Sequence, residues 1–103
     1  MYIYNVTLKV DPSIEEDWLI WMKDIHIPEV LSCGIFKDYK MLLLTNSPFY
    51  DESPGSTFIV QYFFDNMDEY ERYQAEYAPT YQREHIQRYG EKVLAFRTVM
   101  RYL

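Results

Sequence analysis

The strand-like segments of this chain carry large apolar side chains on both parities, and this feature constrains the fold more than any other. Residues 57–64 read TFIVQYFF and residues 92–102 read KVLAFRTVMRY, so neither odd nor even positions are consistently polar. Successive side chains of a strand point to opposite faces of a sheet. A sheet with one face in water normally shows one apolar and one polar face. We therefore expect both faces of this sheet to be covered.

The apolar patterns predict six elements in the order strand, helix, strand, strand, helix, strand. β-branched and aromatic residues favour strands, whereas apolar residues at three- and four-residue spacing favour helices. The connection at residues 46–55 (NSPFYDESPG) is rich in turn-forming residues. The four strands are expected at residues 2–10, 35–45, 57–64 and 92–102.

The first helix is expected to begin after the strand at residues 2–10. Either Asp11 is its cap, with Pro12 in the first turn, or Ser13 and Glu16 form a capping box. Pro28 disfavours helical geometry in the preceding residue, so this helix should end or kink near His26. Gly34 then supplies a C-terminal stop. Its apolar stripe is expected to comprise Ile14, Trp18, Trp21, Met22 and Ile25.

The second helix is expected to be capped by Asp65 or Asn66 and to be interrupted by Pro79. Beyond the proline it carries a ladder of rings at four-residue spacing. Such a row can line a pocket, or it can pack on the sheet with its hydroxyl groups in water. The ladder consists of Tyr77, Tyr81, His85 and Tyr89.

This element order predicts an α+β fold with the ferredoxin-like βαββαβ arrangement, in which a four-stranded antiparallel sheet carries both helices on one face. At 103 residues the chain is long enough for one core, so residues 1–103 are expected to form one domain. The second apolar face is then explained by a second copy of the chain, as a homodimer joined through its sheets and forming a dimeric α/β barrel. The alternative is a few tolerated exposed aromatic side chains.

Charge and cysteine content exclude several classes of function. The net charge of −6 disfavours binding to nucleic acids and to anionic membranes. Cys33 has no second cysteine with which to form a disulfide. The opening residues lack the basic start and apolar run of a signal peptide, and no stretch approaches the ~20 apolar residues that span a bilayer. A cytoplasmic protein is therefore expected.

Several segments resemble an uncharacterised family of small bacterial proteins that is itself a domain of unknown function. They are residues 4–7, 18–31, 61–63, 70–79, 93–97 and His85. The family's fold is similar to that of the dimeric α/β-barrel superfamily. That superfamily includes cofactor-independent quinol monooxygenases, small isomerases, haem-degrading oxygenases and simple ligand binders, so the resemblance implies a fold without choosing a chemistry.

His26 and His85 are the candidate catalytic residues. His26 lies one turn after Met22, near two tryptophans and the Pro28 kink, where an imidazole can act as a base or bind a ligand oxygen. It can equally be a structural histidine that bonds backbone groups freed by the proline. Trp18 and Met22 are expected either to wall a ligand pocket or to belong to the core.

His85 invites a second comparison, because a histidine on the second helix ligates iron in the haem-degrading relatives. The rest of that pattern is missing, so no haem is expected. No metal is expected either, because the two histidines lack the spacing of a metal site. There is no glycine-rich phosphate loop. We therefore expect no cofactor.

Two amides and one guanidinium lie among apolar neighbours in the middle of predicted strands, namely Asn5, Gln61 and Arg97. A buried polar group without a partner costs about 1–3 kcal/mol, so each must find one. They can face a ligand cavity, where an amide polarises a carbonyl and the Arg97 fork binds a carboxylate. They can also form hydrogen bonds across the sheet or in the dimer interface. Together with the residues above, the candidate ligand-binding set is Asn5, Trp18, Met22, His26, Gln61, Tyr81, His85 and Arg97.

Two functions are consistent with these patterns. The first is a homodimer that binds a small apolar or aromatic metabolite between helices and sheet. The second is a cofactor-independent monooxygenase or isomerase acting on a phenolic or enolisable compound, with His26 or His85 moving a proton. A plainer option is an interaction protein whose cavity is filled by its own tyrosines. The sequence does not identify the ligand or a reaction.

Overall fold

The computed structural model describes residues 1–46 and 54–103. Strands and helices alternate in two halves, as the apolar patterns predict. The first helical segment also contains a 3-10 turn at Pro12–Ile14 and a π turn at Met22–His26, and a 3-10 turn at Gly90–Lys92 precedes the last strand. The elements are β1 (Tyr2–Val10), α1 (Glu15–Trp21), α2 (Ile27–Ser32), β2 (Asp38–Leu43), β3 (Ser56–Phe64), α3 (Met67–Glu76), α4 (Ala78–Tyr89) and β4 (Val93–Arg101).

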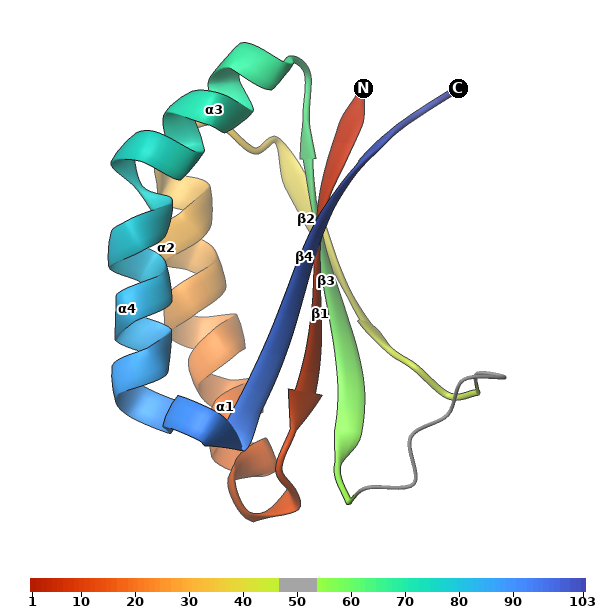
Figure 1. The fold of residues 1–103 in the computed structure, drawn as a ribbon, viewed down its shortest axis with the longest axis vertical. Helices are drawn as coiled ribbons and strands as arrows, with labels where there is room; N and C mark the ends of the chain where they lie inside the picture. The colour runs from red at the N-terminus through yellow and green to blue at the C-terminus, as the bar shows by residue number, and fades with distance from the viewer. Residues whose placement is uncertain (47–53) are drawn as a thin grey trace.

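The four strands form one antiparallel sheet in the order β2-β3-β1-β4. All four helices lie against one face of this sheet, and none of the described residues forms a helix on the other face (Figure 1). The ends of the chain lie near each other at the same end of the sheet (Figure 1). The α+β, ferredoxin-like architecture expected from the element order is therefore confirmed.

Strand register decides which side chains meet the helices. In β1, Tyr4 lies opposite Tyr62 of β3, and Val6 lies between Val60 of β3 and Arg97 of β4. Since side chains alternate along a strand, these residues share the helix-covered face. Their immediate neighbours in the sequence point to the opposite face, which we call the open face.

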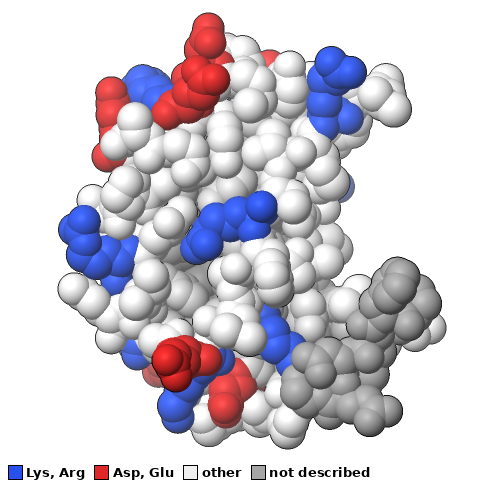
Figure 2. Space-filling model, in the orientation of Figure 1, with Lys and Arg blue, Asp and Glu red and all other residues white. Residues whose placement is uncertain are grey.

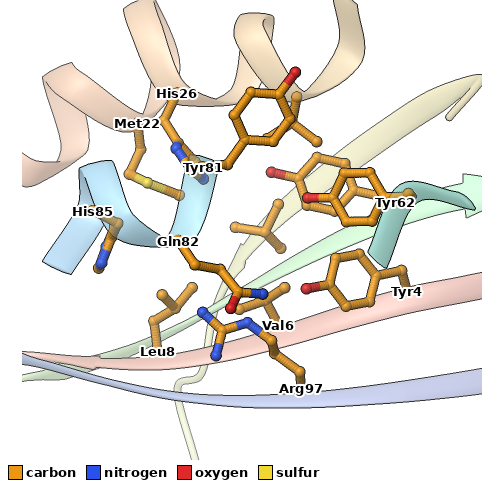
Figure 3. A pocket seen from close by; sticks show the side chains of 13 residues that line it. Tyr4, Val6, Leu8, Met22, His26, Tyr62, Tyr81, Gln82, His85 and Arg97 are labelled. Carbon is orange, nitrogen blue, oxygen red and sulfur yellow. The ribbon is translucent and has the colours of Figure 1, made fainter. Parts of the chain in front are cut away.

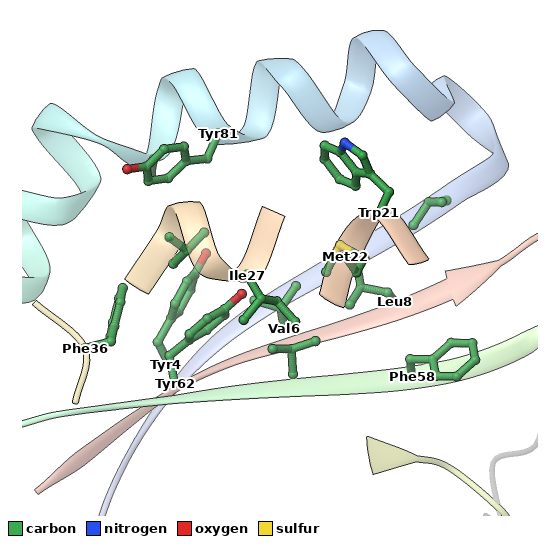
Figure 4. Packing of buried hydrophobic residues seen from close by; sticks show 14 of the residues in the cluster. Tyr4, Val6, Leu8, Trp21, Met22, Ile27, Phe36, Phe58, Tyr62 and Tyr81 are labelled. Carbon is green, nitrogen blue, oxygen red and sulfur yellow. The ribbon is translucent and has the colours of Figure 1, made fainter. Parts of the chain in front are cut away.

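The core lies between the helix-covered face and the helices (Figure 4). Trp18 of α1 is 0% exposed and contacts Phe58, with ring centroids 5.1 Å apart. Aromatic rings also fill the other end of the layer, where Phe36 packs edge-on against Tyr73 at 4.8 Å. Bulky rings each remove a large area from water, which lets a chain of this size build a continuous core.

The first helical segment departs from the predicted stripe at the π turn. Pro28 does not end the helix, since Ile27 keeps helical angles (φ −62°, ψ −46°), and the N–H of Ile27 donates to the carbonyl of Met22 five residues earlier. A proline ring clashes with the carbonyl four residues before it, and one wider turn relieves that clash. The additional residue rotates Ile25 outwards, where it is 52% exposed, so its predicted place in the buried stripe was wrong.

The second helical segment follows the predicted breaks. Asn66, and not Asp65, caps α3 by accepting a hydrogen bond from the Glu69 N–H at 2.9 Å. The segment breaks at Tyr77, and Pro79 stands in the first turn of α4, where its missing N–H costs nothing. At the start of the first segment, Asp11 caps the 3-10 turn through Ser13, which selects the first of the two predicted caps.

Two further predictions concern the second strand and the connection that follows it. The second strand is shorter than predicted, because Ile35 and Phe36 are buried but precede β2, which begins at Asp38. The predicted turn-rich connection lies mainly at residues 47–53, outside the described part of the chain. Across residues 1–46 and 54–103, every helix is too short or too polar to cross a lipid bilayer.

The open face combines a polar centre with exposed apolar side chains. In β4, Leu94 is 58% and Phe96 is 69% exposed on this face. At the centre, the Asn5 amide donates to the Thr7 hydroxyl at 3.2 Å and accepts from the Gln61 amide at 3.3 Å. The polar groups therefore bond within the face, and the large apolar groups remain uncovered.

Candidate ligand pocket

A pocket opens between the helices and the sheet, towards the edge formed by β4 (Figure 3). The sheet contributes its central side chains and one residue from β4. The helices contribute both histidines, a methionine and several tyrosines. Its lining residues are Tyr4, Val6, Leu8, Met22, His26, Val30, Val60, Tyr62, Tyr73, Tyr81, Gln82, His85 and Arg97.

The enclosed part of the pocket is small. Its cavity volume is about 30 Å³, which is room for two or three water molecules. The hollow as a whole, with the solvent at its mouth, measures about 440 Å³. A ligand with one aromatic ring therefore has to extend into the mouth, where Gln82 and Arg97 lie (Figure 3).

His26 reaches the pocket because of the π turn. Its ring stacks on Trp21, five residues earlier, with centroids 4.9 Å apart. Its Nδ1 is buried and has no hydrogen-bond partner among the described residues. Burial, and then the neighbouring His85 and Arg97, lower the pKa of His26 from 6.5 to about 4. His26 is therefore neutral at pH 7, and one nitrogen of this lining residue is buried without a hydrogen-bond partner among the described residues.

His85 lines the same pocket from α4, but one of its nitrogens is occupied. The Trp18 indole N–H donates to His85 Nε2 at 3.0 Å. Since Nε2 accepts this bond, the proton of the neutral ring lies on Nδ1. Burial, and then Arg97, lower the pKa of His85 from 6.5 to about 4. His85 is thus a neutral ring at pH 7, and its basic nitrogen, Nε2, already accepts the hydrogen bond from Trp18.

The phenols of the pocket are also held uncharged. Burial raises the pKa of Tyr4, Tyr62 and Tyr73 above the usual value for tyrosine. Tyr4 and Tyr62 stack with centroids 5.9 Å apart, and Tyr81 faces His26 edge-on at 6.4 Å. The pocket therefore presents aromatic faces and neutral hydroxyl groups.

Arg97 is the one charged residue among the lining residues that the structure describes. Its charge and its hydrogen bond to Tyr4 oppose the rise in the pKa of that phenol. Seen from the side of β4, a basic side chain lies at the middle of the face, and the acidic side chains gather towards its ends (Figure 2). Apolar rings, neutral imidazoles and one cation can hold a small, mostly aromatic molecule with an electron-rich polar group. Within the described residues, no three histidine, cysteine or acidic side chains gather as a metal site.

The structure brings five of the eight sequence-predicted residues to the pocket, namely Met22, His26, Tyr81, His85 and Arg97. The other three, Asn5, Trp18 and Gln61, do not line it. Trp18 is buried behind the pocket and reaches it only through its bond to His85. Asn5 and Gln61 lie on the open face, because they alternate with Tyr4 and Tyr62, which face the helices. Their amides bond across the sheet, as the alternative interpretation proposed.

Most of the lining residues that the sheet contributes were not predicted from the sequence. Tyr4, Val6 and Leu8 of β1 and their partners Val60 and Tyr62 were assigned to a strand face but not to a site. Alternation along β1 was the signal that could have found them. Gln82 on α4 gave no such signal, since a glutamine on a helix is usually in solvent.

The whole chain matches the model of one protein family. The family described as a domain of unknown function (DUF4286) matches residues 1–103. The chain belongs to this family. The resemblance noted in the sequence is thereby confirmed. No curated protein sequence matches this DUF4286 chain.

Solved structures share the fold of the DUF4286 chain at low sequence identity. An ethyl tert-butyl ether d (EthD) family protein from Bacillus halodurans is 14% identical, with a TM-score of 0.68 and coverage of 100% of both chains. Hydroxynitrile lyase from Passiflora edulis is 12% identical with a TM-score of 0.61, and a dimeric ferredoxin-like protein from an uncultured marine organism is 11% identical with a TM-score of 0.60. Each of these two alignments covers 99% of this chain and 95% of the other.

Proposed function

We propose that this DUF4286 protein is a homodimer in which each subunit binds a small aromatic metabolite in the pocket between helices and sheet. The observation that carries the binding proposal is His26 Nδ1, a buried nitrogen without a partner at the wall of a pocket. Leaving such a group unpaired costs about 1–3 kcal/mol. A ligand hydroxyl or carbonyl that bonds to it would recover that free energy.

The aromatic character of the ligand follows from the lining. Tyr4, Tyr62 and Tyr81 offer ring faces and edges, and rings pair favourably with other rings in offset or edge-on geometry. The neutral state of His26 and His85 at pH 7 avoids a cluster of positive charge that would disfavour apolar ligands. A one-ring compound with one polar substituent meets both requirements.

Phenol is a suitable probe of this site. We expect phenol to shift the NMR signals of His26, Tyr62 and Tyr81, and His26→Leu to weaken its binding about tenfold, the equivalent of one lost hydrogen bond. The same variant should keep or gain stability, because it removes an unpaired buried nitrogen. Gln61→Leu, on the open face, serves as the matched control and should bind phenol as the wild type does.

Two results would contradict the binding proposal. One is a set of phenol-induced shifts confined to residues outside the pocket. The other is unchanged phenol affinity in His26→Leu together with a loss of affinity in Gln61→Leu. Native mass spectrometry of the purified protein then reports the mass of the assembly and of any small molecule that it carries.

The homodimer is supported by the open face. Leu94, Phe96 and Met100 of β4 present exposed apolar side chains there, joined by Leu42 of β2. Contiguous apolar surface of this kind marks an interaction site. The similar protein from an uncultured marine organism is described as dimeric, which agrees with this proposal. A two-fold pair of open faces would cover both patches at once.

A charge placed on the open face tests the dimer. We expect Phe96→Asp to make the protein monomeric in analytical ultracentrifugation, because an unpaired carboxylate would be buried against the partner. Ile86→Asp is the matched control, since Ile86 is 62% and Phe96 is 69% exposed in the protomer, but Ile86 lies on α4. Dimer loss in both variants, or a wild-type monomer at micromolar concentration, would refute the interface.

A second candidate function, proton removal from a phenolic or enolisable compound, is favoured by the same free nitrogen of His26. Such a step begins isomerisation and cofactor-independent oxygenation alike. A base whose conjugate acid has a pKa of about 4 is weak, so the reaction would depend on Arg97 to stabilise the anion. Because this needs one more condition than binding does, it ranks second.

Exchange of hydrogen for deuterium tests this second candidate. In D2O, the methyl protons of acetophenone should exchange faster with wild-type protein than with His26→Gln. A rate equal to that of buffer would exclude proton removal from this probe. A cytoplasmic location and the lack of nucleic-acid partners stay predictions from the sequence.

A further inference from the structure

Arg97 carries a positive charge that no acidic side chain of the described residues neutralises. It lies on the helix-covered face of β4, opposite Val6, and its exposed side chain reaches the mouth of the pocket (Figure 3). None of the ion pairs formed among the described residues includes it. Its hydrogen bond goes to the neutral phenol of Tyr4. A cation without a counter-charge at the mouth of a pocket favours the binding of a ligand with a negatively charged group.

The four titratable groups whose pKa values Arg97 lowers are uncharged at pH 7. Its field lowers the pKa of both His26 and His85, and both imidazoles are neutral as a result of burial together with this charge. Tyr4 and Tyr70 are protonated phenols, and burial is the first cause of their raised pKa values. The described lining residues therefore carry one positive charge in total, which one negative charge on a ligand would balance.

We propose that the ligand of this pocket is an aromatic monocarboxylate, whose carboxylate pairs with Arg97 at the mouth and whose ring lies inside among Tyr4, Tyr81 and His26. This inference rests on the proposed binding function and specifies the chemical class of the ligand. The planar, five-donor guanidinium fits the two oxygens of a carboxylate with parallel hydrogen bonds.

Other anions fit the pocket less well. A phosphate ester carries nearly two charges and three acceptor oxygens, which require more than one cation or a set of backbone N–H groups. An ordinary phenol has a pKa near 10 and is uncharged at neutral pH, whereas a carboxylic acid, with a pKa near 4, is ionised. A fatty acid has no ring to meet the aromatic lining.

Comparing benzoate with benzamide isolates the effect of the ligand's charge on binding, since the two compounds have nearly the same size and planarity. At low ionic strength we expect benzoate to bind wild-type protein about tenfold more tightly than benzamide, as charge-assisted hydrogen bonds are about twice as strong as neutral ones. Added NaCl should weaken benzoate binding and leave benzamide binding unchanged. NMR titration of the wild-type protein measures both.

Variants of two arginines on the same strand complete the experiment. Arg97→Gln should abolish the preference for benzoate while benzamide still binds, and Arg97→Lys should keep part of it. Arg101→Gln is the matched control: Arg101 shares the strand and parity of Arg97 and is exposed as Arg97 is, but it does not line the pocket, so its loss should not change the preference.

The outcomes distinguish the two proposals. Equal affinity for benzoate and benzamide, or a benzoate preference that survives in Arg97→Gln, would overturn the carboxylate assignment and leave the binding function standing. Failure of phenol, benzamide and benzoate alike to shift the signals of the pocket would overturn both. A preference lost equally in Arg97→Gln and Arg101→Gln would assign the effect to overall charge.

Discussion

Replacing Trp18 with alanine is expected to lower the free energy of unfolding by about 3–5 kcal/mol, the range for large-to-small changes of a buried tryptophan. Trp18 is 0% exposed and packs against Phe58, so its removal leaves a cavity next to the sheet. It also removes the indole N–H that bonds to His85 Nε2, which leaves a second buried nitrogen unpaired. Urea denaturation at one fixed protein concentration measures the change.

Two further variants make this prediction specific. Trp18→Phe keeps most of the packing but not the hydrogen bond, and it should cost about 1–3 kcal/mol, the penalty for an unpaired buried acceptor. Ile20→Ala, on the exposed side of α1, should change stability by less than about 0.5 kcal/mol. A Trp18→Ala protein as stable as Ile20→Ala would show that Trp18 does not anchor the helices to the sheet.

Stability is expected to fall steeply between pH 6.5 and pH 4 because of the two histidines of the pocket. Both have pKa values lowered from 6.5 to about 4 in the folded protein. In this window the unfolded chain binds protons that the folded chain does not, so protons favour unfolding. Their contribution is fully present above pH 6.5 and is lost as the pH falls towards 4.

Each histidine taken alone contributes about 3 kcal/mol to this loss, from about 2.5 pKa units at 1.36 kcal/mol per unit. The two contributions are not additive, because His85 causes part of the shift of His26. Protonation of His85 Nε2 would also displace the Trp18 hydrogen bond. The two histidines together should therefore lower the free energy of unfolding by more than one histidine alone would, but by less than twice that amount.

Comparison with a variant isolates the histidine effect from that of the carboxylates. In His85→Gln an amide oxygen can still accept from the Trp18 N–H, but nothing at this position titrates. We expect the loss of stability between pH 7 and pH 4.5 to be about 2–3 kcal/mol smaller in this variant. Curves that run parallel for wild type and His85→Gln would contradict the low pKa of His85.

The pocket shows how far sequence patterns reach. Alternation along β1 identified which side chains share a face, but β3 and β4 carry large apolar side chains on both faces, so the strands taken together did not decide which face meets the helices. For that reason Asn5 and Gln61 were assigned to the pocket, although the helices cover the face of Tyr4 and Tyr62. Contacts with α4 select the face, and such contacts join segments far apart in the chain.

The histidines illustrate the same limit. Pro28 indicates a disturbance of the first helix, but the pattern does not state whether the chain stops, bends or inserts a wider turn. In the structure a π turn forms, Ile25 points outwards, and the helix continues beyond the proline with Ile27 and Val30 buried. Similarly, Trp18 and His85 are 67 residues apart, and nothing in their spacing predicts a hydrogen bond.

By itself, the sequence determined the element order, the ferredoxin-like class and the candidate residues for the helix caps, because these depend on alternation, helical spacing and turn residues within a few positions. The tertiary structure alone decided which face of the sheet became the wall of the pocket, which histidine kept a free nitrogen, and that Arg97 met no carboxylate among the described residues. These outcomes depend on the packing of distant segments, and local sequence carries no record of that packing.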